Sequence, residues 1–202
     1  MENIIYIILI SLTIILFKFI FKINLKKAKE IQENKSLEKI TDKFPENMQI
    51  AKEILGMIKN DTVKIEEAKD TQTSLYIVAT NKISIADMKN NYARIQTIAH
   101  ECLHSIQDKT ILLFNFIFSN VSIFYLIVAI ILTICNVIQN TMLQIFILTL
   151  ISIIKLTVRG YLEIDAMTKA RYLSEKYIDS KQIITKEEKQ NLLQKYDEIN
   201  KT

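Results

Sequence analysis

Residues 91–108 read NYARIQTIAHECLHSIQD, a segment without glycine or proline in which apolar residues recur at helical spacing. At 100° per residue its apolar side chains fall on one arc, while His100 and His104 fall on the opposite side. The members of the arc are Ile95, Ile98, Ala99, Cys102 and Ile106. The segment is therefore predicted to be a helix whose apolar back packs on a core and whose histidine-bearing front faces a cleft.

His100 and His104 are the only two histidines among the 202 residues, and Glu101 follows the first of them. On a helix, positions i and i+4 lie one turn apart on the same face, so both imidazoles can bind a single zinc ion. The glutamate of such an HExxH pattern can act as the general base toward a water activated by the metal. The motif predicts one Zn²⁺ per chain, against the alternative of two exposed histidines without a metal.

Three apolar segments predict membrane spans. Residues 3–21 carry one charge, Lys18, and nineteen residues in a helix cover about 28 Å, close to the hydrocarbon thickness of a bilayer. Basic residues follow this segment and no small-residue cleavage site does, which favours a retained anchor over a signal peptide. Residues 111–135 and 141–158 are also almost free of charge and are predicted to form a transmembrane hairpin.

The distribution of basic residues predicts the orientation of these spans. Neither the N-terminal tip nor the link 136–140 contains lysine or arginine, so the positive-inside rule places both outside and residues 22–110 and 159–202 in the cytoplasm. The net charge of +4 follows from this asymmetry. The basic residues alternate with acids and lack aromatic neighbours for base stacking, so no nucleic acid is expected as a partner. The basic residues at the span ends are Lys22, Lys26, Lys27, Lys29, Lys109, Lys155 and Arg159.

A helix and a small sheet are predicted before the histidine helix. Pro45 opens a helix over residues 46–59, and residues 62–65 and 75–80 are rich in β-branched side chains, as in strands. A third strand, residues 81–86, is expected to border the cleft, where an extended peptide could pair with its free edge. The alternative is an ordinary small sheet that packs on helices. The residues assigned to that edge are Lys82, Ile83, Ser84 and Ile85.

The two histidines do not by themselves identify the third metal ligand. Two histidines leave a catalytic zinc one protein ligand short, and the candidates are a carboxylate or water. Past the hairpin, residues 159–172 (RGYLEIDAMTKARY) read as a helix with Glu163 and Asp165 at its membrane-proximal end. The small residues Ala166 and Ala170 would let this helix approach the histidine helix closely. Because the hairpin returns the chain to the same side of the membrane, Glu163 can meet the histidines.

These features together resemble a known family. The motif His100-Glu101-x-x-His104-Ser105-Ile106-Gln107, the hairpin, and Glu163-x-Asp165-Ala166 are similar to the bacterial neutral zinc membrane metallopeptidases of the YugP type, and more distantly to HtpX-type and CAAX prenyl proteases. The resemblance implies a gluzincin in which His100, His104 and Glu163 hold zinc and Glu101 is the base. Leu103 departs from the glycine usual in the family, and Met167 stands where the distant relatives have aspartate.

The expected fold is that of a mainly α membrane protein with a small β-sheet, combining a zincin-like α+β cytoplasmic domain with about three transmembrane helices. Its expected divisions are a span (3–21), the cytoplasmic half with the HExxH helix (22–110), the hairpin (111–158) and a cytoplasmic helical region with the third ligand (159–202). Four residues near Glu163 are candidates for orienting a ligand imidazole or stabilising an oxyanion. They are Asp165, Tyr161, Arg159 and Arg171.

The expected activity is zinc-dependent peptide-bond hydrolysis at the cell membrane, with peptides or membrane proteins as substrates and the lipid bilayer as a partner. The rival hypothesis is a catalytically inactive membrane interaction protein or metal-binding scaffold on a protease-like fold. An inactive protein of this kind would be expected to have lost a metal ligand or the general base. The sequence retains Glu101 and both histidines, which favours the enzyme. The pattern indicates neither a particular substrate nor an oligomeric state.

Overall fold

The computed structural model describes residues 34–68, 71, 73–88, 91–135, 137 and 140–201. The predicted span 3–21 lies outside these residues. The chain is mainly helical, with a small three-stranded sheet, as its pattern predicts. The helices are α3 (Lys35–Thr41), α4 (Asn47–Met57), α5 (Arg94–His104), α6 (Lys109–Ile134), α7 (Thr141–Lys181) and α8 (Lys186–Asn200), and the strands are β1 (Lys64–Ala68), β2 (Leu75–Ile77) and β3 (Lys82–Ala86).

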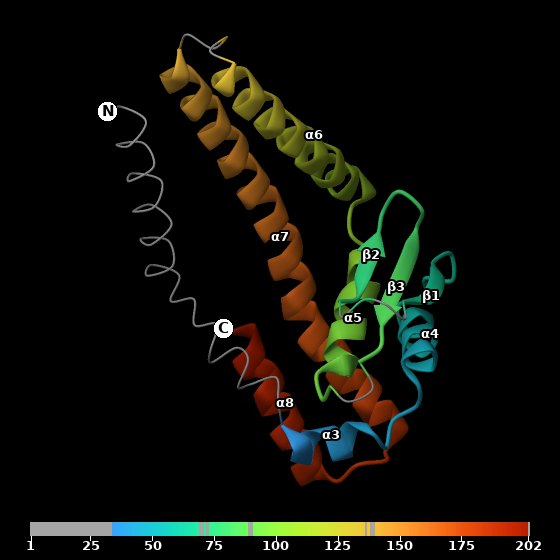
Figure 1. The fold of residues 1–202 in the computed structure, drawn as a ribbon. Coiled ribbons are helices and arrows are strands. Elements are labelled where there is room, and N and C mark those ends of the chain that lie inside the picture. The colour runs from blue at the N-terminus through green and yellow to red at the C-terminus, as the bar shows by residue number, and fades with distance from the viewer. Residues whose placement is uncertain are drawn as a thin grey trace.

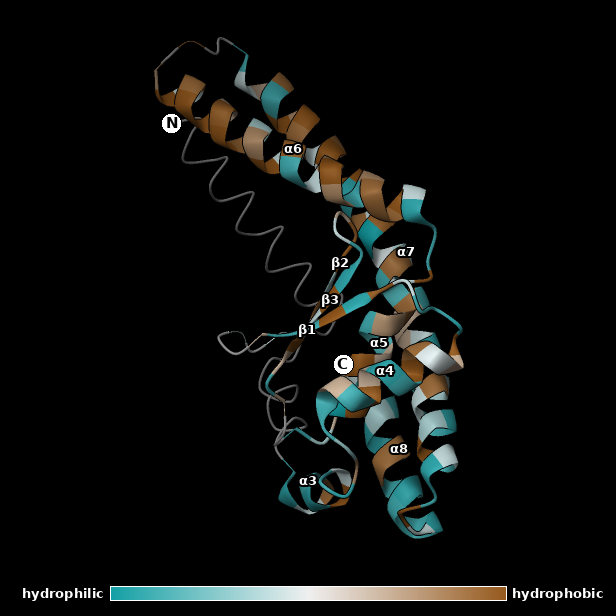
Figure 2. Cartoon of the chain, turned by 90° about the vertical axis from the view of Figure 1, so that its right-hand side faces the viewer, coloured by the Kyte–Doolittle hydropathy of each residue, from teal (hydrophilic) through white to brown (hydrophobic). Residues whose placement is uncertain are grey.

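Helices α6 and α7 form a long hairpin that projects from the rest of the chain (Figure 1). Both helices are long and apolar enough to cross a membrane, by length and composition. Figure 2 shows that apolar residues dominate α6 and the adjoining half of α7, whereas polar residues dominate the far half of α7 and α8. Side chains such as Phe124, Ile131 and Phe146 are exposed along the hairpin. An apolar surface of this extent is typical of a helix pair that contacts lipid or another protein.

Helix α7 is continuous over 41 residues, about 60 Å, and joins the hairpin to the body of the protein. The sequence suggested two separate pieces, a span to residue 158 and a helix from 159. Gly160 at this junction does not interrupt the helix, since its backbone has helical geometry and helices tolerate an isolated glycine at modest cost. A single rigid element therefore carries both the apolar segment and the predicted third ligand.

The sheet has the order β1-β3-β2, with β1 parallel and β2 antiparallel to β3. The prediction that Lys82, Ile83, Ser84 and Ile85 form a free edge is therefore wrong, because these residues lie in the central strand. Alternation in a sequence reports which face of a strand is buried, not how many neighbours the strand has. Within the described residues the strand next to the histidine helix is β2, whose second edge has no further strand partner.

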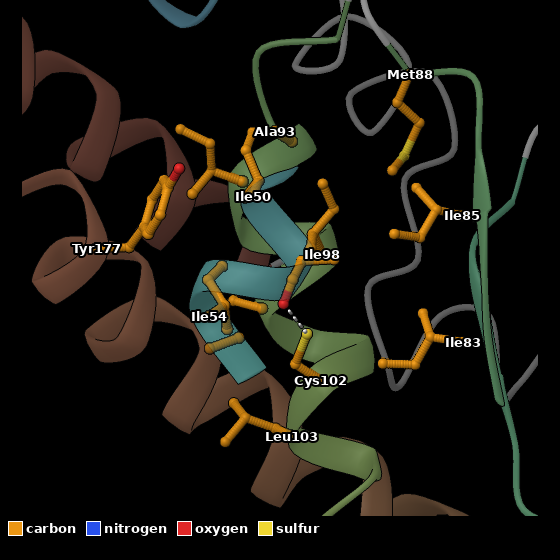
Figure 3. Packing of buried hydrophobic residues seen from close by; sticks show 14 of the residues in the cluster. Ile50, Ile54, Ile83, Ile85, Met88, Ala93, Ile98, Cys102, Leu103 and Tyr177 are labelled. Atoms are coloured by element: carbon orange, nitrogen blue, oxygen red, sulfur yellow. Dashed lines mark hydrogen bonds between the residues drawn. The ribbon is translucent and has the colours of Figure 1, made fainter. Parts of the chain in front are cut away.

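Helix α5 lies at the centre of the core. Ile98 and Cys102 are fully buried, with Ile54 of α4 packed beside them and Ile83 of β3 on the opposite side (Figure 3). Burial raises the pKa of the Cys102 thiol, so this cysteine is a packing residue, not a nucleophile. The predicted apolar arc is confirmed except for Ile106, which is 49% exposed because α5 ends at His104.

Arg94, at the first position of α5, is buried and ties this helix to the turn between α3 and α4. Its guanidinium donates to the backbone carbonyls of Thr41, Phe44 and Pro45 and to the side-chain oxygen of Asn47. Hydrogen bonds from a charged donor to buried acceptors are among the stronger ones in a protein. Arg94 therefore fixes the start of the histidine helix against the rest of the body.

Replacement of Arg94 by alanine is expected to lower the thermal unfolding midpoint in detergent by roughly 6–12 °C, because buried carbonyls lose their donor. Circular dichroism at 222 nm measures the shift. Lys52→Ala, at an exposed position of α4, is the matched control and should change the midpoint by less than about 2 °C. Equal midpoints for the two variants would contradict the anchoring role of Arg94.

Candidate metal centre

Three potential metal ligands meet where α5 crosses α7. His100 and His104 lie one turn apart on α5, Glu163 lies on α7, and one ligand atom from each falls within 4.8 Å of the others. The helices approach closely because α7 presents Leu162, together with the alanines at 166 and 170, as buried residues on one side. Among the carboxylates that were candidates for the third ligand, Glu163 is the one that the structure places beside the histidines.

The spacing of these atoms fits zinc. His100 Nε2 lies 3.0 Å from His104 Nε2, and Glu163 Oε2 lies 3.2 Å and 3.7 Å from these two nitrogens. Ligands about 2.0–2.1 Å from a tetrahedral zinc stand about 3.4 Å from each other, so the observed triangle matches one face of such a tetrahedron. Two imidazole nitrogens and one carboxylate are also a donor set that catalytic zinc uses, with a fourth position left open.

The orientation of His104 is set by Gln107, a residue to which the sequence pattern assigned no role. The amide nitrogen of Gln107 donates to the Leu162 carbonyl at 2.8 Å and to Asp165 Oδ2 at 3.0 Å. Its oxygen must then face His104 Nδ1, 2.8 Å away, which assigns the proton of the neutral ring to Nδ1. The lone pair of His104 therefore lies on Nε2, the atom that faces His100 and Glu163.

Asp165 acts on the imidazole through this amide. The sequence placed it two positions beyond Glu163, a spacing that directs it to another side of α7, and Gln107 bridges the gap. Burial of His104 opposes its protonated form, but the nearby Glu163 carboxylate and the Gln107 oxygen outweigh burial and raise its pKa. A polar residue one turn after the second histidine was the signal in the sequence that could have identified Gln107.

Glu101 is almost fully buried, at 7% exposure, next to the two histidines. Its Oε2 accepts the backbone N–H of Tyr76, on the outward edge of β2, at 2.7 Å. Burial raises the pKa of the carboxyl, while the neighbouring histidines and the Tyr76 N–H work in the opposite direction. A general base with an elevated proton affinity suits catalysis near neutral pH. The contact with β2 is a backbone contact, which no side-chain pattern could reveal.

The remaining predicted site residues lie in three different places. Arg159 lies beside the ligand carboxylate, with its Nε 3.6 Å from Glu163 Oε1. Tyr161 faces a separate cavity that it shares with Lys169. Arg171 pairs with Glu175 and with Asp197 of α8, so neither Tyr161 nor Arg171 lies at the metal centre. Proximity to Glu163 along the chain is therefore a poor guide, because residues of one helix point in different directions.

A cavity of about 560 Å³ opens at the metal centre, between β2, α5 and the facing sides of α6 and α7. Both histidines, Glu101, Glu163 and Arg159 contribute to its wall. The remaining wall consists of Thr73, Ser74, Leu75, Tyr76, Ile77, Val78, Leu112, Asn115, Phe116, Ser119, Asn120 and Leu162. The site is therefore concave, with one wall from a strand edge and another from the hairpin, as expected of a place that receives a ligand.

An HExxH helix, a carboxylate from a second helix and a buried glutamate in a cavity define the class of zinc hydrolases. Residues 4–195 match the family model described as "Putative neutral zinc metallopeptidase", and the chain belongs to that family. The family description implies zinc and peptide substrates, in agreement with the resemblance seen in the sequence. Comparison with curated proteins and with solved structures finds no match.

Glu163→Ala is expected to remove zinc from the protein, because two histidines alone hold the ion weakly. The measurement is the zinc content after gel filtration, by elemental mass spectrometry, in a Glu101→Gln background that prevents self-digestion. Zinc should fall from about one ion per chain to below about 0.2. Glu175→Ala, on the same helix but paired with Arg171, is the matched control and should keep its zinc. Equal zinc in both variants would rule out Glu163 as a ligand.

Gln107→Ala should weaken zinc binding by about 10–100-fold, since removal of the partner of a ligand imidazole typically has this effect. Competition with a chromophoric chelator gives the affinity, and ¹⁵N NMR of the metal-free protein reports the His104 tautomer. Asp165→Asn should have a smaller effect, because Gln107 keeps its bond to Leu162. Gln49→Ala, on α4, is the control. An unchanged tautomer together with unchanged affinity in Gln107→Ala would contradict the assignment.

Proposed function

We propose that this chain is a membrane-embedded, zinc-dependent metallopeptidase of the gluzincin type. The observation that carries the proposal is the triangle of His100, His104 and Glu163 at zinc spacing, with Glu101 buried beside it in the same cavity. Membership of the zinc metallopeptidase family supports it independently. One Zn²⁺ per chain would be held by the two imidazole nitrogens and the carboxylate.

When bound, the zinc ion supplies a Lewis acid that polarises the scissile carbonyl and lowers the pKa of a water molecule. Glu101 takes a proton from this water and later passes it to the leaving amine. Gln107 and Asp165 hold His104 in the tautomer that offers Nε2 to the metal.

Arg159 is the proposed donor to the developing oxyanion. Its guanidinium lines the cavity beside Glu163, whereas Tyr161 and Arg171 point elsewhere. The outward edge of β2 is the proposed binding edge for the peptide backbone, in place of the β3 residues that the sequence suggested. Backbone pairing recognises an extended chain without regard to its side chains, which suits a peptidase.

We further propose a multi-pass topology in the cell membrane. Residues 3–21 and the hairpin 111–158 would span the bilayer, with the N-terminus outside and residues 22–110 and 159–202 forming the cytoplasmic catalytic part. Support comes from the two long apolar helices and from the positions of the basic residues along the chain. The metal centre would then lie at the cytoplasmic membrane surface, because Glu163 follows the apolar part of α7 by about one turn.

Glu101→Gln should keep zinc and lower the cleavage of denatured casein at least about a hundredfold, because the amide cannot accept the proton. The experiment uses the full chain in detergent and follows peptide release, with zinc content measured in parallel. Removal of zinc by a chelator should abolish cleavage, and added zinc should restore it. Glu187→Gln, at an exposed position of α8, is the matched control and should cleave normally.

Two outcomes would contradict the proposal. Cleavage that survives in Glu101→Gln would exclude this residue as the base. A zinc-loaded wild-type protein that cleaves no peptide would favour the rival hypothesis of an inactive scaffold that binds metal.

A further inference from the structure

The polar side chains of the α6 stretch 111–121 all line the metal-site cavity. This stretch reads ILLFNFIFSNV, and its three polar residues are Asn115, Ser119 and Asn120. At about 100° per residue, Ser119 lies about 40° and Asn120 about 140° from Asn115 around the helix axis, so the three side chains share one half of the helix surface. We call these three residues the α6 polar stripe. Neighbours that do not line the cavity, such as Leu113 and Ile117, are apolar and exposed, as lipid-facing residues are.

In the proposed topology the stripe would lie within the hydrocarbon layer, near its edge. Helix α6 has 26 residues, or about 39 Å, whereas about 20 residues suffice to cross a hydrocarbon core of about 30 Å. Counted back from Ile134, these 20 residues end at Asn115. The stripe would therefore occupy the last roughly 8 Å of hydrocarbon on the side of the metal centre. Figure 1 shows this end of α6 directly beside β2.

The polar groups of the stripe are incompletely satisfied. The side-chain oxygen of Asn115 is buried and has no hydrogen-bond partner among the described residues. The side-chain amide of Asn120 donates to the Phe116 carbonyl of α6 itself, at 2.7 Å. This hydrogen bond is internal to α6 and does not connect α6 to α7. A polar group at this depth costs free energy unless a partner satisfies it. Ser119 and Asn120 therefore offer hydrogen-bonding groups at the cavity wall, whereas the Asn115 oxygen is covered by its neighbours.

We propose that the substrates of this site are transmembrane polypeptides, cleaved where a span unwinds near the cytoplasmic surface. This inference rests on the proposed function. An unwound segment exposes N–H and C=O groups that hydrocarbon cannot satisfy. The α6 polar stripe supplies partners for these groups on one wall of the cavity, and β2, whose Tyr76 N–H is already bonded to Glu101, forms the other wall. The stripe thus leads an extended chain from the bilayer to the metal centre.

The test compares binding of two fluorescent peptides to the Glu101→Gln protein in lipid nanodiscs. One is a single-span peptide of leucine and alanine with an Asn-Gly pair near its cytoplasmic end, and the other is a soluble casein peptide. The triple variant Asn115→Leu, Ser119→Ala and Asn120→Leu should lower the affinity for the span relative to the casein peptide about tenfold. Thr149→Leu with Ser152→Leu, polar-to-apolar changes on α7 outside the cavity, is the matched control and should change neither affinity.

An unchanged ratio of the two affinities in the triple variant would overturn the proposal. Loss of both affinities to the same extent would also overturn it and would instead indicate that the stripe hydrates the metal centre. Zinc content and elution volume show whether the triple variant is folded. Because binding is measured without turnover, the result does not depend on whether the wild-type protein cleaves casein. Failure of the proposed function would appear in the casein cleavage assay and not in this binding experiment.

Discussion

The packing of α5 against α7 is the contact on which the candidate centre depends. Helix α5 supplies two imidazoles but no third donor, and α7 supplies Glu163 only because its small side chains at 166 and 170 let the two helices approach. A larger residue at either alanine would push Glu163 away from the histidines. Since the ligand triangle has sides of 3.0 to 3.7 Å, a shift of 1 Å would spoil its fit to one ion.

The same helix couples the site to the membrane. Because α7 runs without a break from the apolar hairpin into the body, the position of Glu163 relative to the apolar segment follows from the helical rise alone. The buried polar groups around the centre then fix its chemistry. Gln107 selects one tautomer of His104, and the Tyr76 N–H holds Glu101 against the edge of β2. The bond between Gln107 and His104 is local, but the bonds from Gln107 to α7 and from Tyr76 to Glu101 join elements that are distant in the sequence, so the centre forms only in the folded chain.

Local patterns were reliable wherever helical or apolar periodicity carried the information. The spacing of His100 and His104 and the apolar arc behind them predicted α5 and its two faces, and two apolar runs predicted α6 and the first half of α7. Prediction failed where the answer depended on neighbours. The β3 segment was predicted to be an edge strand, yet β1 and β2 pair with it on both sides. Arg171 follows Glu163 on the same helix, yet it pairs with Asp197 of α8.

The sequence by itself determined the helix that carries the two histidines, the glutamate proposed as the base and the long apolar segments, because one helix or one span is specified by residues close together in the chain. Only the tertiary structure decided that Glu163 meets the histidines, that Asp165 reaches His104 through Gln107, and that β2 provides the open edge. These outcomes depend on the angle and distance between packed elements. Packing of side chains from several elements sets those quantities, and no single segment encodes them.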